Sequence, residues 1–99
     1  MKPAIELDKQ RIAHFCRRNH IQRLSLFGSV LREDFGPASD VDVLVQFEPG
    51  AVVTLLDMVR IEDELAEIVG RKVDLRTPQE LSRYFRDEVL ATAVVQYAV

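Results

Sequence analysis

Residues 26–45, LFGSVLREDFGPASDVDVLV, place a glycine–serine turn ten residues before a pair of aspartates. Gly28 and Ser29 end one apolar run, and Asp40 and Asp42 stand at the start of another. Because side chains alternate between the two faces of a strand, the two aspartates project together while the valine between them enters the core. Two carboxylates on one face form a hard-oxygen site that suits Mg²⁺.

A third acid, Asp74, lies in the short run 72–76 and has an apolar residue on each side. If those neighbours face the core, Asp74 lies on the same face as Asp40 and Asp42. Adjacent strands are about 4.8 Å apart, so we expect the three carboxylates to converge. Such carboxylates repel one another unless a divalent cation neutralises them, and Mg²⁺ there can activate a hydroxyl and steady leaving phosphate oxygens. The pattern predicts nucleotidyl transfer.

The glycine–serine turn fits the same chemistry. Gly28 allows a triphosphate to approach the backbone closely, and the Ser29 hydroxyl and neighbouring amides can donate hydrogen bonds to it. If a helix begins at Ser29, its N-terminus adds a partial positive charge. Arg32, one turn along, can reach a phosphate with its planar guanidinium.

Apolar periodicity alternates between helix and strand along the chain. The expected elements are a helix at about 6–19, a strand at 23–27, a short helix at 30–34, a strand at about 41–47, a helix from Leu55 to Gly70 capped by Thr54, and a strand at 72–76. After Thr77 and Pro78, a last helical region with a break near Arg86 is expected to reach the C-terminus. We therefore expect one domain, 1–99, of the α/β (α+β) class.

Composition sets the broad class of the protein. The 99 residues are 47% apolar and 29% charged, with a net charge of −3, which disfavours direct binding of nucleic acid. No run approaches the roughly 20 apolar residues of a membrane span, and the N-terminus lacks the charged-then-apolar layout of a signal peptide. A lone cysteine, Cys16, agrees with a reducing compartment, so we expect a cytoplasmic protein that does not enter a membrane.

The stretch 89–99 is apolar nearly all round. A helix of that kind must be buried, and we expect it to pack over the sheet. An exposed remainder would mark a surface for a partner or for self-association through this C-terminal helix.

Plainer interpretations stand beside these. The glycine–serine pair is compatible with an ordinary turn, the aspartate pair with a solvated strand edge, and Asp74 with simple exposure. Arg32 could form a surface ion pair with Glu33 or Asp34. The acidic residues Glu62, Asp63, Glu64 and Glu67 are most simply the solvated face of the central helix, and Cys16 a buried apolar side chain.

The complete pattern is similar to the nucleotidyltransferase superfamily that includes DNA polymerase beta. The resemblance lies in Leu26-Phe27-Gly28-Ser29, a ten-residue gap, Asp40-Val41-Asp42, and Asp74 on a later strand, and it covers about 11–97. Because the chain has 99 residues, it resembles the minimal nucleotidyltransferase (MNT) branch. Many members of that branch have glycine directly after the position of Arg32, where this chain has Glu33.

The resemblance implies a mixed sheet, ATP as donor, Mg²⁺ as cofactor, and transfer of AMP to a tyrosine of a HEPN-domain toxin, with the chain as antitoxin of a type VII pair. It also implies roles by position. Asp40 and Asp42 would bind metal, and Asp74 would complete the metal site and help activate the acceptor hydroxyl. The triphosphate would lie on Gly28, Ser29 and Arg32.

Two classes of function remain open at this point. In one, the protein is an enzyme that needs all three aspartates. In the other, it is a non-catalytic antitoxin that neutralises its partner by forming a complex and only holds nucleotide. The intact acid set favours the enzyme, because mutually repelling carboxylates serve no purpose in a simple interface. A third option, an antibiotic or tRNA nucleotidyltransferase, is less favoured, because the resemblance associates those activities with longer chains that carry additional domains for the acceptor.

Overall fold

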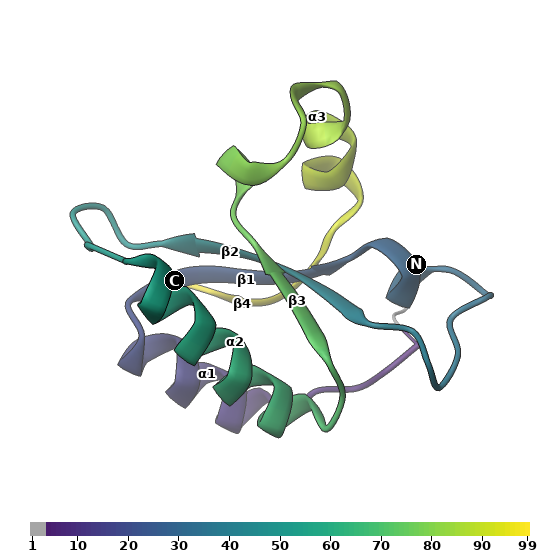
Figure 1. Cartoon of the computed structure of the whole chain (residues 1–99), viewed down its shortest axis with the longest axis horizontal. Coiled ribbons are helices and arrows are strands. Elements are labelled where there is room, and N and C mark those ends of the chain that lie inside the picture. The colour runs from purple at the N-terminus through teal and green to yellow at the C-terminus, as the bar shows by residue number, and fades with distance from the viewer. Residues whose placement is uncertain (1–3) are drawn as a thin grey trace.

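A computed structural model describes residues 4–99 as a four-stranded mixed sheet with three α-helices (Figure 1). The elements in chain order are α1 (Lys9–Arg18), β1 (Ile21–Phe27), the 3₁₀ turn η1 (Gly28–Leu31), β2 (Val41–Phe47), α2 (Leu55–Val69), β3 (Val73–Arg76), the 3₁₀ turn η2 (Pro78–Glu80), α3 (Arg83–Thr92) and β4 (Val94–Ala98). The expected α/β class with a mixed sheet is confirmed.

The strand order in the sheet is β3-β2-β1-β4. β1 runs antiparallel to both of its neighbours, β2 and β4, whereas β2 and β3 are parallel. A parallel pair needs a crossover connection, and α2 supplies it. Helices α1 and α2 therefore lie together on one side of the sheet, and α3 projects from the opposite side (Figure 1).

The core lies between the sheet and the α1–α2 layer. Apolar side chains alternate into it from the strands, and the helices add one face each. The largest fully buried side chains are Phe15, Ile12, Ile21, Leu24, Leu26, Leu44, Ile61, Leu65, Val30, Val41, Val43 and Val45. Cys16 is buried among them, and burial raises the pKa of its thiol to about 12. The prediction that Cys16 is a buried apolar side chain is confirmed.

Local signals fix both long helices. Asp8 caps α1 by accepting from the backbone of Gln10 and Arg11, so this helix begins later than expected. Thr54 and Asp57 form a capping box at the start of α2, and Gly70 ends that helix in the left-handed conformation with φ of 78°. The expected bounds of α2 are confirmed.

The expectation of helix through to the C-terminus is wrong. The segment after Pro78 forms the turn η2, breaks at Leu81 and Ser82 rather than near Arg86, continues as α3 and ends as strand β4. β4 pairs with β1, which places Tyr97 opposite Leu24. The expected short helix at 30–34 is also displaced, to the single turn η1. The last segment is therefore a strand and not the expected helix, and self-association of the chain stays a prediction.

Within residues 4–99, no helix has both the length and the apolar character required to cross a bilayer.

Candidate active site

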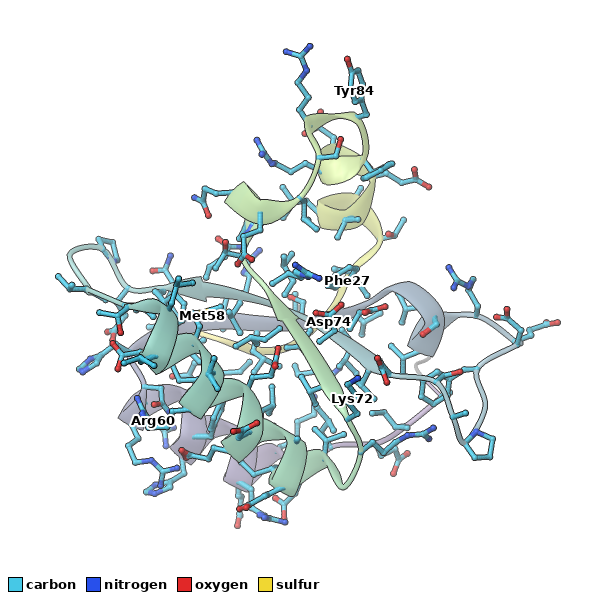
Figure 2. The ribbon with its side chains drawn as sticks, viewed as in Figure 1. Phe27, Met58, Arg60, Lys72, Asp74 and Tyr84 are labelled. Atoms are coloured by element: carbon cyan, nitrogen blue, oxygen red, sulfur yellow. The ribbon has the colours of Figure 1, made fainter. Side chains whose placement is uncertain are left out.

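The register of the parallel pair places two of the three predicted acids side by side. Asp42 on β2 is the direct partner of Asp74 on β3, and Phe27 at the end of β1 is the partner of Asp42 on its other side. Asp40 lies two residues before Asp42, immediately before β2 begins. Figure 2 shows Asp74 and Phe27 on the side of the sheet from which α3 projects. The acids therefore adjoin the glycine–serine turn.

Gly28 makes room for the carboxylate of Asp42. A Cβ atom built on Gly28 would lie 2.2 Å from Asp42 Oδ2, and the backbone at Gly28 has a φ of 73°. Both features require glycine, because a side chain would collide with the carboxylate and the left-handed conformation disfavours other residues. Gly28, which was predicted to let phosphate approach the backbone, thus also leaves the space that the Asp42 carboxylate occupies.

Ser29 joins the turn to the acid pair at two points. Its backbone amide donates a hydrogen bond to the Asp42 carboxylate, and its Oγ donates to the backbone oxygen of Asp40 at 3.2 Å. Ser29 itself is half-buried. These bonds fix the position of the turn relative to the start of β2.

The electrostatics of Asp42 are those of a partly desolvated acid among like charges. Burial raises the pKa of its carboxyl, and the neighbouring Asp74 and Asp40 raise it further. The Ser29 amide and the more distant Arg32 act in the opposite direction without reversing the shift. A cation placed among these carboxylates would remove the repulsion.

Basic side chains form ion pairs with Asp40 and Asp74, the two acids on either side of Asp42 in sequence. Lys72 Nζ lies 3.9 Å from Asp40 Oδ2. Arg76 contacts both carboxylate oxygens of Asp74, at 3.1 Å from Nε and 3.4 Å from an NH₂ nitrogen, and also lies 3.8 Å from Glu80. No sequence interpretation assigned these partners, although the alternating charges of Lys72, just before β3, and of Asp74 and Arg76 within it are a visible signal.

The acids fit a hard divalent cation in chemistry and in backbone register. Among the side chains of residues 4–99, however, no three from His, Cys, Asp and Glu stand close enough together to share a metal ion. The strand register places Asp42 and Asp74 side by side, as predicted, but the three carboxylates do not converge closely enough to share a metal ion. Two of the carboxylates, those of Asp40 and Asp74, are engaged in ion pairs with Lys72 and Arg76.

Arg32 is exposed at the end of η1. Its Nε lies 3.5 Å from Asp34 Oδ1, which is one of the two surface pairs considered from the sequence. The single 3₁₀ turn is too short to build the dipole of a helix, so the expected contribution of a helix N-terminus to phosphate binding is not available. Arg32 nevertheless lines a cavity together with Gly28.

Comparison with known proteins decides the family. The sequence-family model described as nucleotidyltransferase domain matches residues 9–95. The chain belongs to the nucleotidyltransferase domain family. A Methanocaldococcus jannaschii protein provisionally named a protein adenylyltransferase is 36% identical over 86 residues, covering 87% of this chain and 90% of the relative. The protein adenylyltransferase MntA of Thermococcus cleftensis is 32% identical over 74 residues, covering 75% of this chain and 73% of MntA.

Solved structures agree. A structure provisionally described as a minimal nucleotidyltransferase has a TM-score of 0.71 and 35% identity, covering 87% of this chain and 86% of that chain. The same fold occurs in a toxin–antitoxin structure with AMP-PNP, at a TM-score of 0.73, 21% identity and coverages of 94% and 75%. It also occurs in a complex of tri-AMPylated Shewanella oneidensis HEPN toxin with MNT antitoxin. The TM-score is 0.65 and the identity 20%, covering 92% of this chain and 70% of that chain.

Arg71 was not singled out by sequence reasoning, yet it holds the loop that leads into the acids of this nucleotidyltransferase. Its guanidinium lies 4.4 Å from the centre of the Phe35 ring, and it donates to the backbone oxygens of Gly36 and Ser39. The backbone amide of Val41 donates to Lys72 O at 2.9 Å. The turn after α2 thus secures the loop at 35–39, immediately before Asp40.

Part of the acidic run on α2 has a structural role. Glu62 accepts a hydrogen bond from the backbone amide of Leu75 at 2.9 Å, on the edge strand that carries Asp74. Glu64 forms ion pairs with Arg18 and Arg60. The interpretation of the whole run as a solvated face is therefore wrong for Glu62 and Glu64, which are half-buried.

Proposed function

We propose that this nucleotidyltransferase transfers AMP from ATP to a hydroxyl group of a partner protein, a tyrosine of a HEPN-domain toxin, and so acts as its antitoxin. The observation that carries the proposal is the register of Asp42 with Asp74, directly beside the Gly28 turn. Support comes from MntA-type relatives and from structural neighbours described as toxin–antitoxin complexes.

In this proposal Asp40, Asp42 and Asp74 hold Mg²⁺, which supplies charge neutralisation and an activated nucleophile when bound. Gly28, Ser29 and Arg32 hold the triphosphate. This division of roles assigns an anionic face to the metal and a donor-rich turn to the phosphates.

The chemical step forms one bond and breaks another. The acceptor oxygen bonds to the α-phosphorus of ATP, and the bond from that phosphorus to the bridging oxygen breaks, so that pyrophosphate leaves. The proton of the acceptor hydroxyl passes to Asp74, which lies on the edge strand of the sheet, half-buried and paired with Arg76. Asp42, held by the Ser29 amide beneath the turn, keeps its position relative to the phosphates.

A second candidate is neutralisation by binding alone. Exposed apolar residues favour it: Val52, Leu55, Leu56 and Val59 around the start of α2, and Tyr84 and Phe85 on α3. A contiguous apolar surface commonly marks a protein interface. Such an interface would serve either function, so catalysis has to be tested directly.

The test incubates a HEPN-domain protein with this chain, ATP and Mg²⁺, and measures the intact mass of the HEPN-domain protein. We expect the mass to increase by one or more AMP units with the native chain and to stay unchanged with Asp42→Asn. A stable complex without any mass change would favour neutralisation by binding alone. The complex formed by Asp42→Asn is the matched control for folding.

A further inference from the structure

A cavity of about 670 Å³ lies between η1 and α3 and borders Gly28. Phe27, Leu31 and Arg32 line one side, and Glu88, Val89 and Thr92 of α3 line the other. Cavities of about 300–1,000 Å³ are the usual size for small-molecule sites. The position of the cavity beside the proposed phosphate site makes it the nearest space for the rest of a nucleotide.

The lining chemistry matches the parts of a nucleotide. Arg32 offers a guanidinium, Leu31 and Val89 offer apolar surface, and Glu88 offers a carboxylate. A nucleotide carries anionic phosphates, a flat base that favours apolar contact, and in adenine an exocyclic amine that donates hydrogen bonds. Hydrogen bonds to an ionised acceptor are stronger than neutral ones, so Glu88 is suited to an amine.

α3 is held in place although it adds nothing to the core. None of its residues is buried, and it stands away from the sheet (Figure 1). Arg86 donates to the backbone oxygens of Pro78 at 2.7 Å and Leu81 at 3.0 Å, which fixes the helix to the segment leading from β3. A helix that is anchored but not packed provides a preformed wall for a ligand.

We propose that this cavity holds the nucleoside of the donor nucleotide, with the base against Leu31 and Val89 and its exocyclic amine donating to Glu88. The proposal rests on the proposed function, because the position of the triphosphate orients the nucleotide. It assigns base preference to α3, and it predicts that bases with an amine are favoured over those with a carbonyl at the same position.

The first test separates the nucleoside from the phosphates by measuring the affinity for ATP and for inorganic tripolyphosphate, both with Mg²⁺. We expect ATP to bind more tightly, and Val89→Trp, which fills the cavity, to abolish that advantage while tripolyphosphate binds as before. Leu90→Trp, at the next position on α3 and outside this cavity, is the control. Circular dichroism confirms that each variant is folded.

Two outcomes would overturn the assignment. If Val89→Trp keeps the full advantage of ATP, the nucleoside lies elsewhere. If Val89→Trp weakens both ligands equally, the cavity holds phosphates and not the base. Failure of the native chain to bind either ligand would instead contradict the proposed function, and this proposal with it.

The second test addresses Glu88 by comparing ATP with inosine triphosphate, in which a carbonyl oxygen replaces the amine. One hydrogen bond to an ionised acceptor corresponds to a preference of about 10- to 150-fold for ATP. Glu88→Gln should bring the ratio of the two affinities close to one, because an amide can accept from the amine or donate to the carbonyl. Asp87→Asn, at the preceding position, should leave the ratio unchanged. An unchanged ratio in Glu88→Gln overturns the role of Glu88.

Discussion

Gly28 and Asp42 face each other so closely that a Cβ atom on Gly28 would lie 2.2 Å from the Asp42 carboxylate. The turn proposed to hold phosphate and the acid proposed to hold metal are consequently one packed unit. Gly28 also has a φ of 73°, which other residues rarely adopt. Because other glycines with positive φ lack such a contact, the effect of the collision with Asp42 can be measured separately from the effect of backbone strain.

Gly28→Ala should destabilise the protein and abolish nucleotide binding, because the new methyl group displaces Asp42. Gly50→Ala is a matched control, since Gly50 has a φ of 86° but open space around its Cβ position. Backbone strain alone costs on the order of 1–3 kcal/mol in both variants. Urea unfolding should give a greater loss for Gly28→Ala, and equal losses would contradict the contact.

Asp42→Asn should stabilise the metal-free protein at neutral pH. The pKa of Asp42 is raised by burial and by Asp74 and Asp40, so the folded chain retains a proton at pH values where the unfolded chain has lost it. Stability therefore falls as the pH rises through that interval, and the charged carboxylate is a cost above it.

Thermal unfolding of the native chain and Asp42→Asn at several pH values checks this prediction. The Tm difference should be largest above the raised pKa of Asp42 and should disappear at acid pH, on a scale of about 4–8 °C per kcal/mol for a domain of this size. Mg²⁺ should raise the Tm of the native chain and not that of the variant. A lower Tm for Asp42→Asn at neutral pH would show that the carboxylate is stabilising.

Arg71→Lys should loosen the loop at 35–39 while the core remains intact. Lysine keeps the charge but cannot reproduce the planar contact with Phe35 together with donation to both Gly36 and Ser39. Hydrogen exchange should be faster in this loop and unchanged in α2. Affinity for Mg²⁺ should fall several-fold, because the loop positions Asp40. Unchanged exchange and affinity together would exclude this role.

Glu62→Ala should cost about 1–3 kcal/mol, because the backbone amide of Leu75 loses its acceptor while that residue stays buried. Glu62→Gln keeps an acceptor oxygen and should recover most of the loss. Asp63→Ala, at the exposed neighbouring position, is the control and should change stability little. The free energy of unfolding in urea measures all three, and equal values for Glu62→Ala and Asp63→Ala would count against the bond.

The central part of the fold could be predicted from the sequence because its signals are local. Alternation fixed the faces of β2 and β3, and the Thr54 cap and Gly70 bounded α2. The C-terminal strand could not be recognised in the same way, since periodicity cannot distinguish an apolar strand from a buried helix. The β-branched pair Val94 and Val95 was the available signal for a strand.

The candidate site likewise contains residues that local sequence patterns predict and residues that they do not. The acids, the glycine and the serine follow from spacing within 28–42 and from the alternation around Asp74. The roles of Arg71 and Glu62 depend on contacts across long stretches of chain, 71 to 36 and 62 to 75, and no local pattern encodes them. The pairing of Arg76 with Asp74 has a local signal in the alternating charges of 72–76, but its geometry required the side-chain positions.

The central claim is that AMP, and not phosphate, moves from ATP to a partner protein. The most direct measurement incubates this chain, Mg²⁺ and a HEPN-domain protein with ATP labelled on either the α- or the γ-phosphate, and follows label on the HEPN-domain protein. We predict label from the α-phosphate only, lost with Asp42→Asn and with Asp74→Asn. Label from the γ-phosphate, or α-label that persists in both variants, would contradict the account.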